Sequence, residues 1–217
     1  MELPYSTLTD WVGATARLIK LLYEALKTEV LQSGYLHVDE TPIKVQDRTG
    51  KGTTHRGWFW VYNNSPGGLV FFDYQEGRDE EGPKGILEGY KGYLQTDGYV
   101  AYDGFEEAEG ITRLFCMAHA RRKFTEALDS DRDRCNHVLE QMGLLYGLER
   151  KCKDWGDESR KQERQAVAVP TLAELGKWMK EQYVQVLPKS PVGKALAYSS
   201  RALGGSVALY HRRDIEH

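Results

Sequence analysis

The chain of 217 residues contains little cysteine and proline and no long hydrophobic run. Its three cysteines, Cys116, Cys135 and Cys152, are an odd number without a Cys-x-x-Cys pair, and no signal peptide precedes them. This pattern fits a reducing cytoplasm better than a disulfide-rich secreted scaffold. A membrane helix needs about 18 or more consecutive apolar residues. Since the sequence has no such stretch, no membrane span is expected.

An excess of basic residues is also absent. The formal net charge is -3 and the pI is about 6.1. Overall charge therefore does not attract nucleic acid, and any affinity for phosphate must come from a local patch. The sequence is 41% apolar and 28% charged, which is enough to bury the core of one domain with a helical appendage.

The hydrophobic period changes twice along the chain. Residues 6–33 have helical spacing and stop at Gly34, which predicts one long amphipathic helix. We expect it to pack on the following domain; a connector towards a partner is the alternative. Short β-rich runs follow at 36–46, 57–63, 69–74, 92–96 and 112–115, with a hairpin turn at 63–68 and a helix at 80–87.

After residue 115 the pattern becomes helical and rich in charge. The spacing predicts helices over 118–128, 134–154 and 171–187, with Pro170, Pro188 and Pro191 as breaks. Residues 158–165 contain almost no apolar side chain, and we expect a solvated helix end or linker there.

The order of three strands, helix, strand, turn and strand predicts an α/β fold, an RNase H-like mixed sheet with a long N-terminal helix and a C-terminal helical insertion. In that fold the first and fourth strands are neighbours at the centre of the sheet. Asp39 and Asp97 each follow a strand-like run, so we expect them to face each other across one strand spacing, roughly 5 Å.

Two such carboxylates are typical of a divalent-metal site for phosphoryl transfer, with ordinary exposed acidity as the alternative. Asp39 is followed by Glu40 and shares a strand face with His37, and Asp97 is followed by a glycine that allows close approach. Nearby Tyr99 and Tyr102 are candidates for a DNA-facing rim or for simple packing.

A basic cluster, Arg121, Arg122 and Lys123, opens the helix after the last strand. We expect it to contact a DNA backbone, with a solvated surface as the alternative. Zinc ligation is a weaker alternative for the same region, because its potential ligands match no common zinc-finger spacing. These ligands are Cys116, His119, Cys135 and His137.

Five motifs together resemble the insertion sequence 66 family of bacterial transposases. They are His-Val-Asp-Glu-Thr-Pro at 37–42, Gln-Thr-Asp-Gly-Tyr at 95–99, Cys-Met-Ala-His-Ala-Arg-Arg-Lys-Phe at 116–124, Leu-Tyr-Gly-Leu-Glu at 145–149 and Leu-Pro-Lys-Ser-Pro-Val-Gly-Lys-Ala-Leu at 187–196. The resemblance runs to about Arg201. It implies an Asp-Asp-Glu site that uses Mg²⁺ or Mn²⁺ to cut and join DNA at transposon ends. Asp39 and Asp97 match the first two acids.

The sequence also departs from the family pattern. Family members are about twice as long, with an N-terminal region for DNA binding and self-association, and their third acid follows the Pro-Lys-Ser-Pro segment in an Asp-Asn-Asn-x-x-Glu motif that this sequence lacks. Glu149 is the remaining candidate for the third acid, and an intrahelical charge beside Arg150 and Lys151 is its alternative. Residues 202–217 do not resemble the family, so we expect a frameshift near Ala202 and an out-of-frame tail. Translation of the gene in the reading frame shifted by one base should restore the Asp-Asn-Asn-x-x-Glu motif.

The resemblance divides the chain into a connector helix (1–34), a partial catalytic core (35–129), a helical insertion (130–201) and the tail (202–217). It implies a bacterial cytoplasmic protein whose partners are transposon ends, target DNA, other transposase subunits and element-encoded accessory proteins, with no membrane. We expect a truncated transposase that is inactive by itself. The alternatives are a standalone nuclease completed by Glu40 or Glu149, and a non-catalytic remnant that binds DNA or a full-length transposase.

Overall fold

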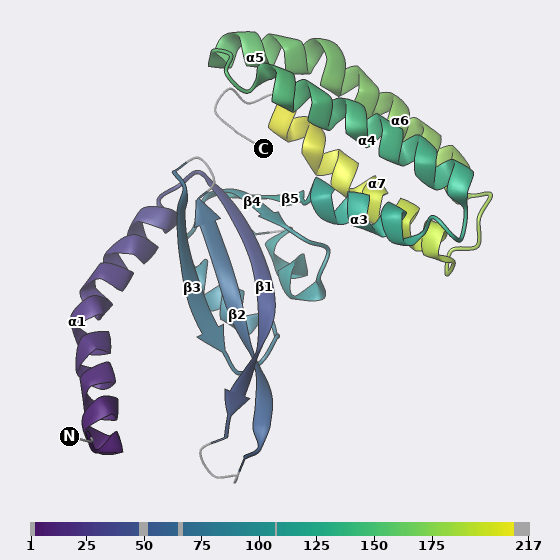
Figure 1. The fold of residues 1–217 in the computed structure, drawn as a ribbon. Helices are drawn as coiled ribbons and strands as arrows, with labels where there is room; N and C mark the ends of the chain where they lie inside the picture. Colours follow the sequence, from purple (N-terminus) through teal and green to yellow (C-terminus); the bar gives the residue numbers. More distant parts are fainter. Residues whose placement is uncertain (1–2, 48–51, 65–66, 107, 211–217) are drawn as a thin grey trace. The chain divides into compact units, whose positions relative to one another are not determined.

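The computed structural model describes residues 3–47, 52–64, 67–106 and 108–210, and the side chains among these as far as residue 203. The chain forms two compact units, residues 1–92 and 93–217. Its five strands have the order β3-β2-β1-β4-β5 (Figure 1). The predicted fold class is confirmed: a long N-terminal helix, a five-stranded mixed sheet in the RNase H-like order, and C-terminal helices.

The first unit contains a long helix and an antiparallel meander. Its elements are α1 (Tyr5–Leu31), β1 (Tyr35–Gln46), β2 (Thr54–Asn64), β3 (Leu69–Gln75) and α2 (Glu81–Ile86). The register runs from His37 opposite Asn63 to Gln46 opposite Thr54, and β3 pairs with β2 from Leu69 opposite Asn64 onward. Trp60, Tyr62 and Phe71 are buried, and the rings of Tyr62 and Phe71 stack at 4.6 Å.

The turn between β2 and β3 lies where the Asn and Gly residues predicted it. Gly67 N–H donates to the Asn64 carbonyl at 3.1 Å and to Asn64 Oδ1 at 3.0 Å, and Gly68 has a φ of +64°. Such a φ suits a residue without Cβ. Residues 65–66 of the predicted turn lie outside the described residues.

Helix α1 packs on the sheet only near its C-terminal end. There, Val30 is fully buried, and Tyr23 Oη donates to the Phe72 carbonyl at 3.1 Å. By contrast, Trp11, Leu18 and Leu22 are 57%, 79% and 71% exposed. The expectation that this face packs on the domain is therefore wrong for these positions. A helix of 27 residues is about 40 Å long, whereas the seven residues of β3 span only about 24 Å.

The second unit joins two strands to a group of helices. Its elements are β4 (Gly92–Thr96, whose first residue closes the first unit), η1 (Val100–Phe105), β5 (Ile111–Phe115), α3 (Met117–Glu126), α4 (Arg132–Cys152), α5 (Asp157–Glu163), η2 (Arg164–Ala168), α6 (Val169–Tyr183) and α7 (Pro191–Tyr210). Helices α3, α4, α6 and α7 pack around one hydrophobic cluster (Figure 1). Phe124, Met142, Leu172, Met179 and Leu196 are at most 1% exposed within it.

Two predictions about the helical region are wrong. Pro170 does not interrupt the helix, because the π-helical turn η2 continues directly into α6, whose second residue is Pro170. A widened turn accommodates a residue that lacks a donor and crowds the preceding carbonyls. Residues 158–165 are not wholly solvated either, since Arg160 and Arg164 are only 7% and 1% exposed.

The last helix occupies much of the region expected to be an out-of-frame tail. The break predicted at Pro188 and Pro191 is confirmed, because residues 184–190 separate α6 from α7, and Pro191 begins α7, a position where its missing N–H costs nothing. The helix continues to Tyr210, and residues 211–217 lie outside the described residues. Among the residues described, no helix is both long and apolar enough to cross a membrane.

Candidate functional site

Asp39 lies within β1 and not at the end of a strand as the sequence suggested. The pairing of β1 with β2 continues past Asp39 as far as Gln46, so the strand extends well beyond this residue. The carboxylate is exposed, and its Oδ1 accepts a hydrogen bond from Glu40 N–H at 2.9 Å. His37, two residues earlier, contacts Tyr35 Oη through Nε2 at 2.8 Å.

Glu40 has a structural partner. Its side chain is 1% exposed, and Oε1 accepts hydrogen bonds from Arg78 Nε, at 2.9 Å, and from Arg78 Nη2. The Arg78 guanidinium also lies 4.7 Å from the centre of the Trp58 ring. Because this carboxylate already balances a cation, the geometry gives no support to Glu40 as a ligand that completes a metal site.

Asp97 directly follows β4, as predicted, and its carboxylate is held by the turn that it begins. Tyr99 N–H donates to Oδ1 at 2.8 Å, an Asx-type bond that fixes the side chain over its own backbone. The Thr96 hydroxyl donates to the Asp97 carbonyl at 2.8 Å. Hydrogen bonds within residues 96–99 thus help to set the position of this carboxylate.

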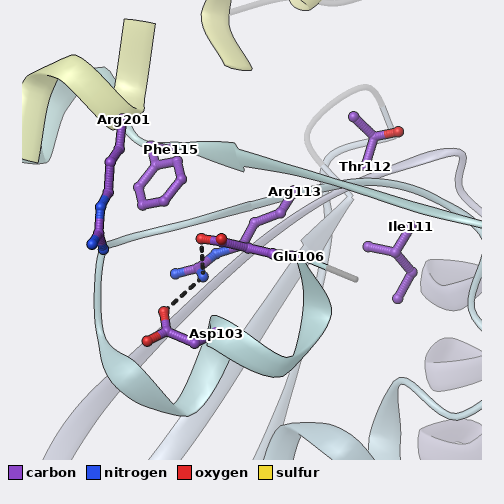
Figure 2. A pocket seen from close by; sticks show the side chains of 7 residues that line it. All are labelled: Asp103, Glu106, Ile111, Thr112, Arg113, Phe115 and Arg201. Carbon is purple, nitrogen blue, oxygen red and sulfur yellow. Dashed lines mark hydrogen bonds and ion pairs between the residues drawn. The ribbon is translucent and has the colours of Figure 1, made fainter. Parts of the chain in front are cut away.

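Arg113 on β5 also holds this turn in place through hydrogen bonds. Its side chain is 1% exposed, with Nε donating to Thr96 Oγ1 at 3.2 Å and Nη2 donating to the Asp97 carbonyl at 3.1 Å. Nη1 donates to Asp103 and Glu106, both at 2.9 Å (Figure 2). The buried charge is therefore compensated, as burial of a guanidinium requires. An open pocket of about 640 Å³ lies beside it.

Tyr198 on α7 packs against the glycine that follows Asp97. A Cβ placed on Gly98 would lie 2.5 Å from Tyr198 Cε2, so no side chain fits there without movement. Burial, and then the negative charge of Asp97, raises the pKa of the Tyr198 phenol. Sequence reasoning named neither Arg113 nor Tyr198. An isolated arginine in a strand and a tyrosine at helical spacing carry no local signal of this role.

The two tyrosines proposed as a rim behave differently. Tyr102 is fully buried and so cannot face DNA, whereas Tyr99 is half-buried with its ring edge-on to Tyr102 at 6.5 Å. Packing in η1, the alternative reading, is correct for Tyr102.

The three residues of the basic cluster have different neighbours. Arg122 pairs with Glu126 at 3.9 Å, and Lys123 Nζ lies 4.8 Å from the centre of the Tyr198 ring. Arg121 instead lines a pocket between α3 and α4 together with Arg150. The three residues therefore have different neighbours, and their contact with a DNA backbone stays a prediction.

Glu149 binds an arginine from another helical segment. Its Oε1 accepts from Arg164 Nε at 2.9 Å and its Oε2 from Arg164 Nη2 at 2.6 Å, and the two side chains are 13% and 1% exposed. The expected pairing with Arg150 or Lys151 is not the one observed, because Lys151 pairs with Glu163 at 2.8 Å. This geometry gives no support to Glu149 as the third acid, which stays a prediction.

Cys116 and His119 interact at the start of α3. Burial opposes ionisation of the thiol, but hydrogen bonds from His119 and from backbone N–H groups outweigh it and lower the pKa of Cys116. Cys135 is fully buried, and the His137 ring lies 4.2 Å from that of Trp178. Throughout the described part of the chain, no three His, Cys, Asp or Glu side chains are grouped so that they could hold a metal ion.

The carboxylates of Asp39 and Asp97 are suitable ligands for a magnesium ion, but they are one fewer than an Asp-Asp-Glu site contains. Carboxylate oxygens are the ligands that Mg²⁺ prefers, and its remaining positions are commonly filled by water and by phosphate oxygens of the substrate. Two protein carboxylates fall short of the three in an Asp-Asp-Glu site.

Comparison with known proteins gives a family and two distant relatives. The family model described as "Transposase IS66 family" matches residues 1–210. "Uncharacterized protein y4hP" of Sinorhizobium fredii is 30% identical over 91% of this chain and 40% of its own length. "Uncharacterized protein y4qI" of the same organism is 28% identical over 92% of this chain and 40% of its own length. The chain thus spans about 40% of the length of these relatives.

Proposed function

Since the chain belongs to the IS66 family of transposases, we propose that it carries part of a site that cuts and joins DNA at the ends of an insertion sequence. Asp39 and Asp97 are the two carboxylates of that site and hold Mg²⁺ or Mn²⁺. The observation that carries this proposal is the strand order, in which β1 and β4 are neighbours, within a family match that includes both aspartates.

The reaction is two displacements at phosphorus. Water attacks a phosphodiester at the transposon end and releases a 3′-hydroxyl, and this hydroxyl then attacks a phosphodiester of the target DNA and displaces another 3′-oxygen. A divalent ion held by Asp39 and Asp97 would neutralise the charge that develops on the phosphoryl oxygens. The protein contributes two fixed carboxylates. The bonds from Tyr99 and Arg113 to the Asp97 turn support its part, since they order the turn before substrate arrives.

A second candidate is a protein that binds DNA without cutting it. This candidate is favoured because the two carboxylates that could complete a metal site already form ion pairs. Glu40 pairs with Arg78, and Glu149 pairs with Arg164. A site with two of three acids binds metal more weakly and positions the nucleophile less well, and misplacement of about 1 Å costs on the order of 100-fold in rate.

Nicking of a supercoiled plasmid separates the two candidates. The first candidate predicts Mg²⁺- or Mn²⁺-dependent nicking, slow because the third acid is missing, that falls at least about 100-fold in Asp39→Asn and in Asp97→Asn; the second candidate predicts no nicking. Asp10→Asn, an exposed carboxylate on α1, is the matched control and should leave the rate unchanged. Nicking that survives in both site variants would overturn the proposed site. Mn²⁺ binding followed by electron paramagnetic resonance gives a second readout, which should weaken in the same two variants.

A further inference from the structure

A basic hollow lies between α3 and α4 of the second unit, apart from the Asp97 turn. It has a volume of about 470 Å³, and we call it the arginine notch. Its lining consists of Ala118, Arg121, Gly143, Tyr146 and Arg150. The small residues Ala118 and Gly143 leave the space open, since nothing lies within 4 Å of a Cβ placed on Gly143.

The two arginines of the notch carry uncompensated charge. Arg121 and Arg150 are exposed, and neither forms an ion pair with a carboxylate in the part of the chain that the structure describes. The cationic residues that follow them in the sequence do form ion pairs, Arg122 with Glu126 and Lys151 with Glu163. Two guanidinium groups at one hollow without a carboxylate attract an anion, and their planar forks match the oxygens of a phosphate.

The glycines of α4 provide independent support. A glycine within a helix destabilises it by roughly 0.5–1 kcal/mol relative to alanine. Gly143 and Gly147 lie one turn apart, and no neighbouring atom explains a glycine at position 143. At Gly147 a Cβ would come within 3.9 Å of Arg150 Nη2. The bare backbone at Gly143 thus leaves room for a group that enters the notch, whereas a Cβ at Gly147 would make only an ordinary van der Waals contact with Arg150.

Tyr146 offers a third donor. Its side chain is half-buried at the notch. Burial raises the pKa of its phenol, and the nearby Arg121 charge acts in the opposite direction. The phenol therefore stays protonated at neutral pH and can donate its hydroxyl hydrogen.

We propose that the arginine notch binds a phosphate of the DNA backbone, with Arg121 and Arg150 as cationic donors and Tyr146 as a neutral one. The identity of the partner as DNA rests on the proposed function. Because the proposed contact is to a phosphate and not to a base, it is independent of sequence and dependent on salt. It retains Arg121 of the predicted cluster, adds Arg150 and omits Arg122 and Lys123.

The test measures affinity for a fluorescent DNA duplex by anisotropy, in EDTA and over a series of salt concentrations. Arg121→Gln and Arg150→Gln should each weaken binding roughly five- to tenfold and reduce the salt slope by about one. Arg122→Gln, one residue away on the same helix, is the matched control and should change affinity less than about twofold. Gly143→Leu adds a good helix former and fills the notch without changing charge, so it should weaken binding while the protein unfolds at the same or a higher temperature.

Each result has a distinct meaning. A wild-type chain that binds no duplex contradicts the DNA role in the proposed function. A wild-type chain that binds while Arg122→Gln loses as much affinity as Arg121→Gln, or while Gly143→Leu loses none, contradicts the notch alone. Inorganic phosphate added at constant ionic strength separates the two sources of phosphate. If it saturates the notch and protects Tyr146 from nitration while DNA does not, the notch is a site for free phosphate and the proposal is wrong.

Discussion

At the scale of single residues, the site is defined by what holds Asp97. Asp97 is half-buried, and its turn is fixed by one buried arginine and by one tyrosine that leaves no space at Gly98. These supports come from β5 and α7, so the geometry of the carboxylate depends on parts of the chain far from it in sequence.

Gly98→Ala tests that close approach. The new methyl group would meet Tyr198 at 2.5 Å, and overpacking of this kind costs about 1–3 kcal/mol in the free energy of unfolding. Urea denaturation should show most of this cost disappearing when Tyr198→Leu is added, which is a coupling between the two sites. Gly104→Ala, with no atom within 4 Å, is the control. An equal cost in both backgrounds would show that Tyr198 does not restrict the turn.

Cys116 should be the most reactive thiol of the chain. Its pKa is lowered mainly by His119 against the opposing effect of burial, whereas burial raises the pKa of Cys135 and of Cys152. Since the thiolate is the nucleophile, alkylation by iodoacetamide near neutral pH should be fastest at Cys116. His119→Ala should raise the pKa of Cys116 and slow the reaction about three- to tenfold below pH 8.

The lowered pKa of Cys116 also determines how the stability of the fold changes with pH. A thiol whose pKa is lower in the folded state stabilises the fold increasingly as pH rises from the folded pKa towards the unfolded one, and loses this contribution as pH falls through the folded pKa. If His119→Ala leaves the pH profile of alkylation in place, the hydrogen bond is not the cause.

At the scale of elements, the ion pair between Glu149 and Arg164 joins α4 to η2. Removing one partner of a buried pair leaves an uncompensated charge and costs about 3–5 kcal/mol. We expect Glu149→Ala to lower the free energy of unfolding by that amount in urea denaturation. Glu140→Ala, exposed on the same helix, should change it by less than about 0.5 kcal/mol. Loss of nicking with unchanged stability would instead indicate that Glu149 is the third acid.

At the scale of the whole molecule, stability is unevenly distributed. The buried cluster between Phe115 and Leu203 lies entirely in the second unit, whereas the first turns of α1 carry exposed apolar side chains. Isolated helices are marginal in water, because most helical stability comes from packing.

Hydrogen exchange followed by mass spectrometry should reveal this difference. We expect amides of residues 8–19 to exchange at least about 100-fold faster than those of residues 138–148, which are packed in α4. The measurement is repeated after dilution of the protein. Protection of residues 8–19 that vanishes on dilution would show that a second copy covers the exposed face of α1.

The elements that local pattern specifies were predictable. Alternating apolar residues located all five strands within three residues of their observed ends, and Asn and Gly located the turn at Asn64. The order of elements then indicated the strand order, because an RNase H-like sheet is one of few arrangements that this succession allows. The continuous helix through Pro170 was missed because a π-helical turn has no sequence signal.

The sequence by itself determined the family, the succession of elements and the identity of Asp39 and Asp97 as the candidate acids. Only the tertiary structure decided which charges are already engaged. Glu40 and Arg78 are separated by 38 residues, and Glu149 and Arg164 by 15, so no local pattern reveals either pair. The physical reason is that secondary structure follows from local periodicity, whereas burial and ion pairing depend on how the elements pack.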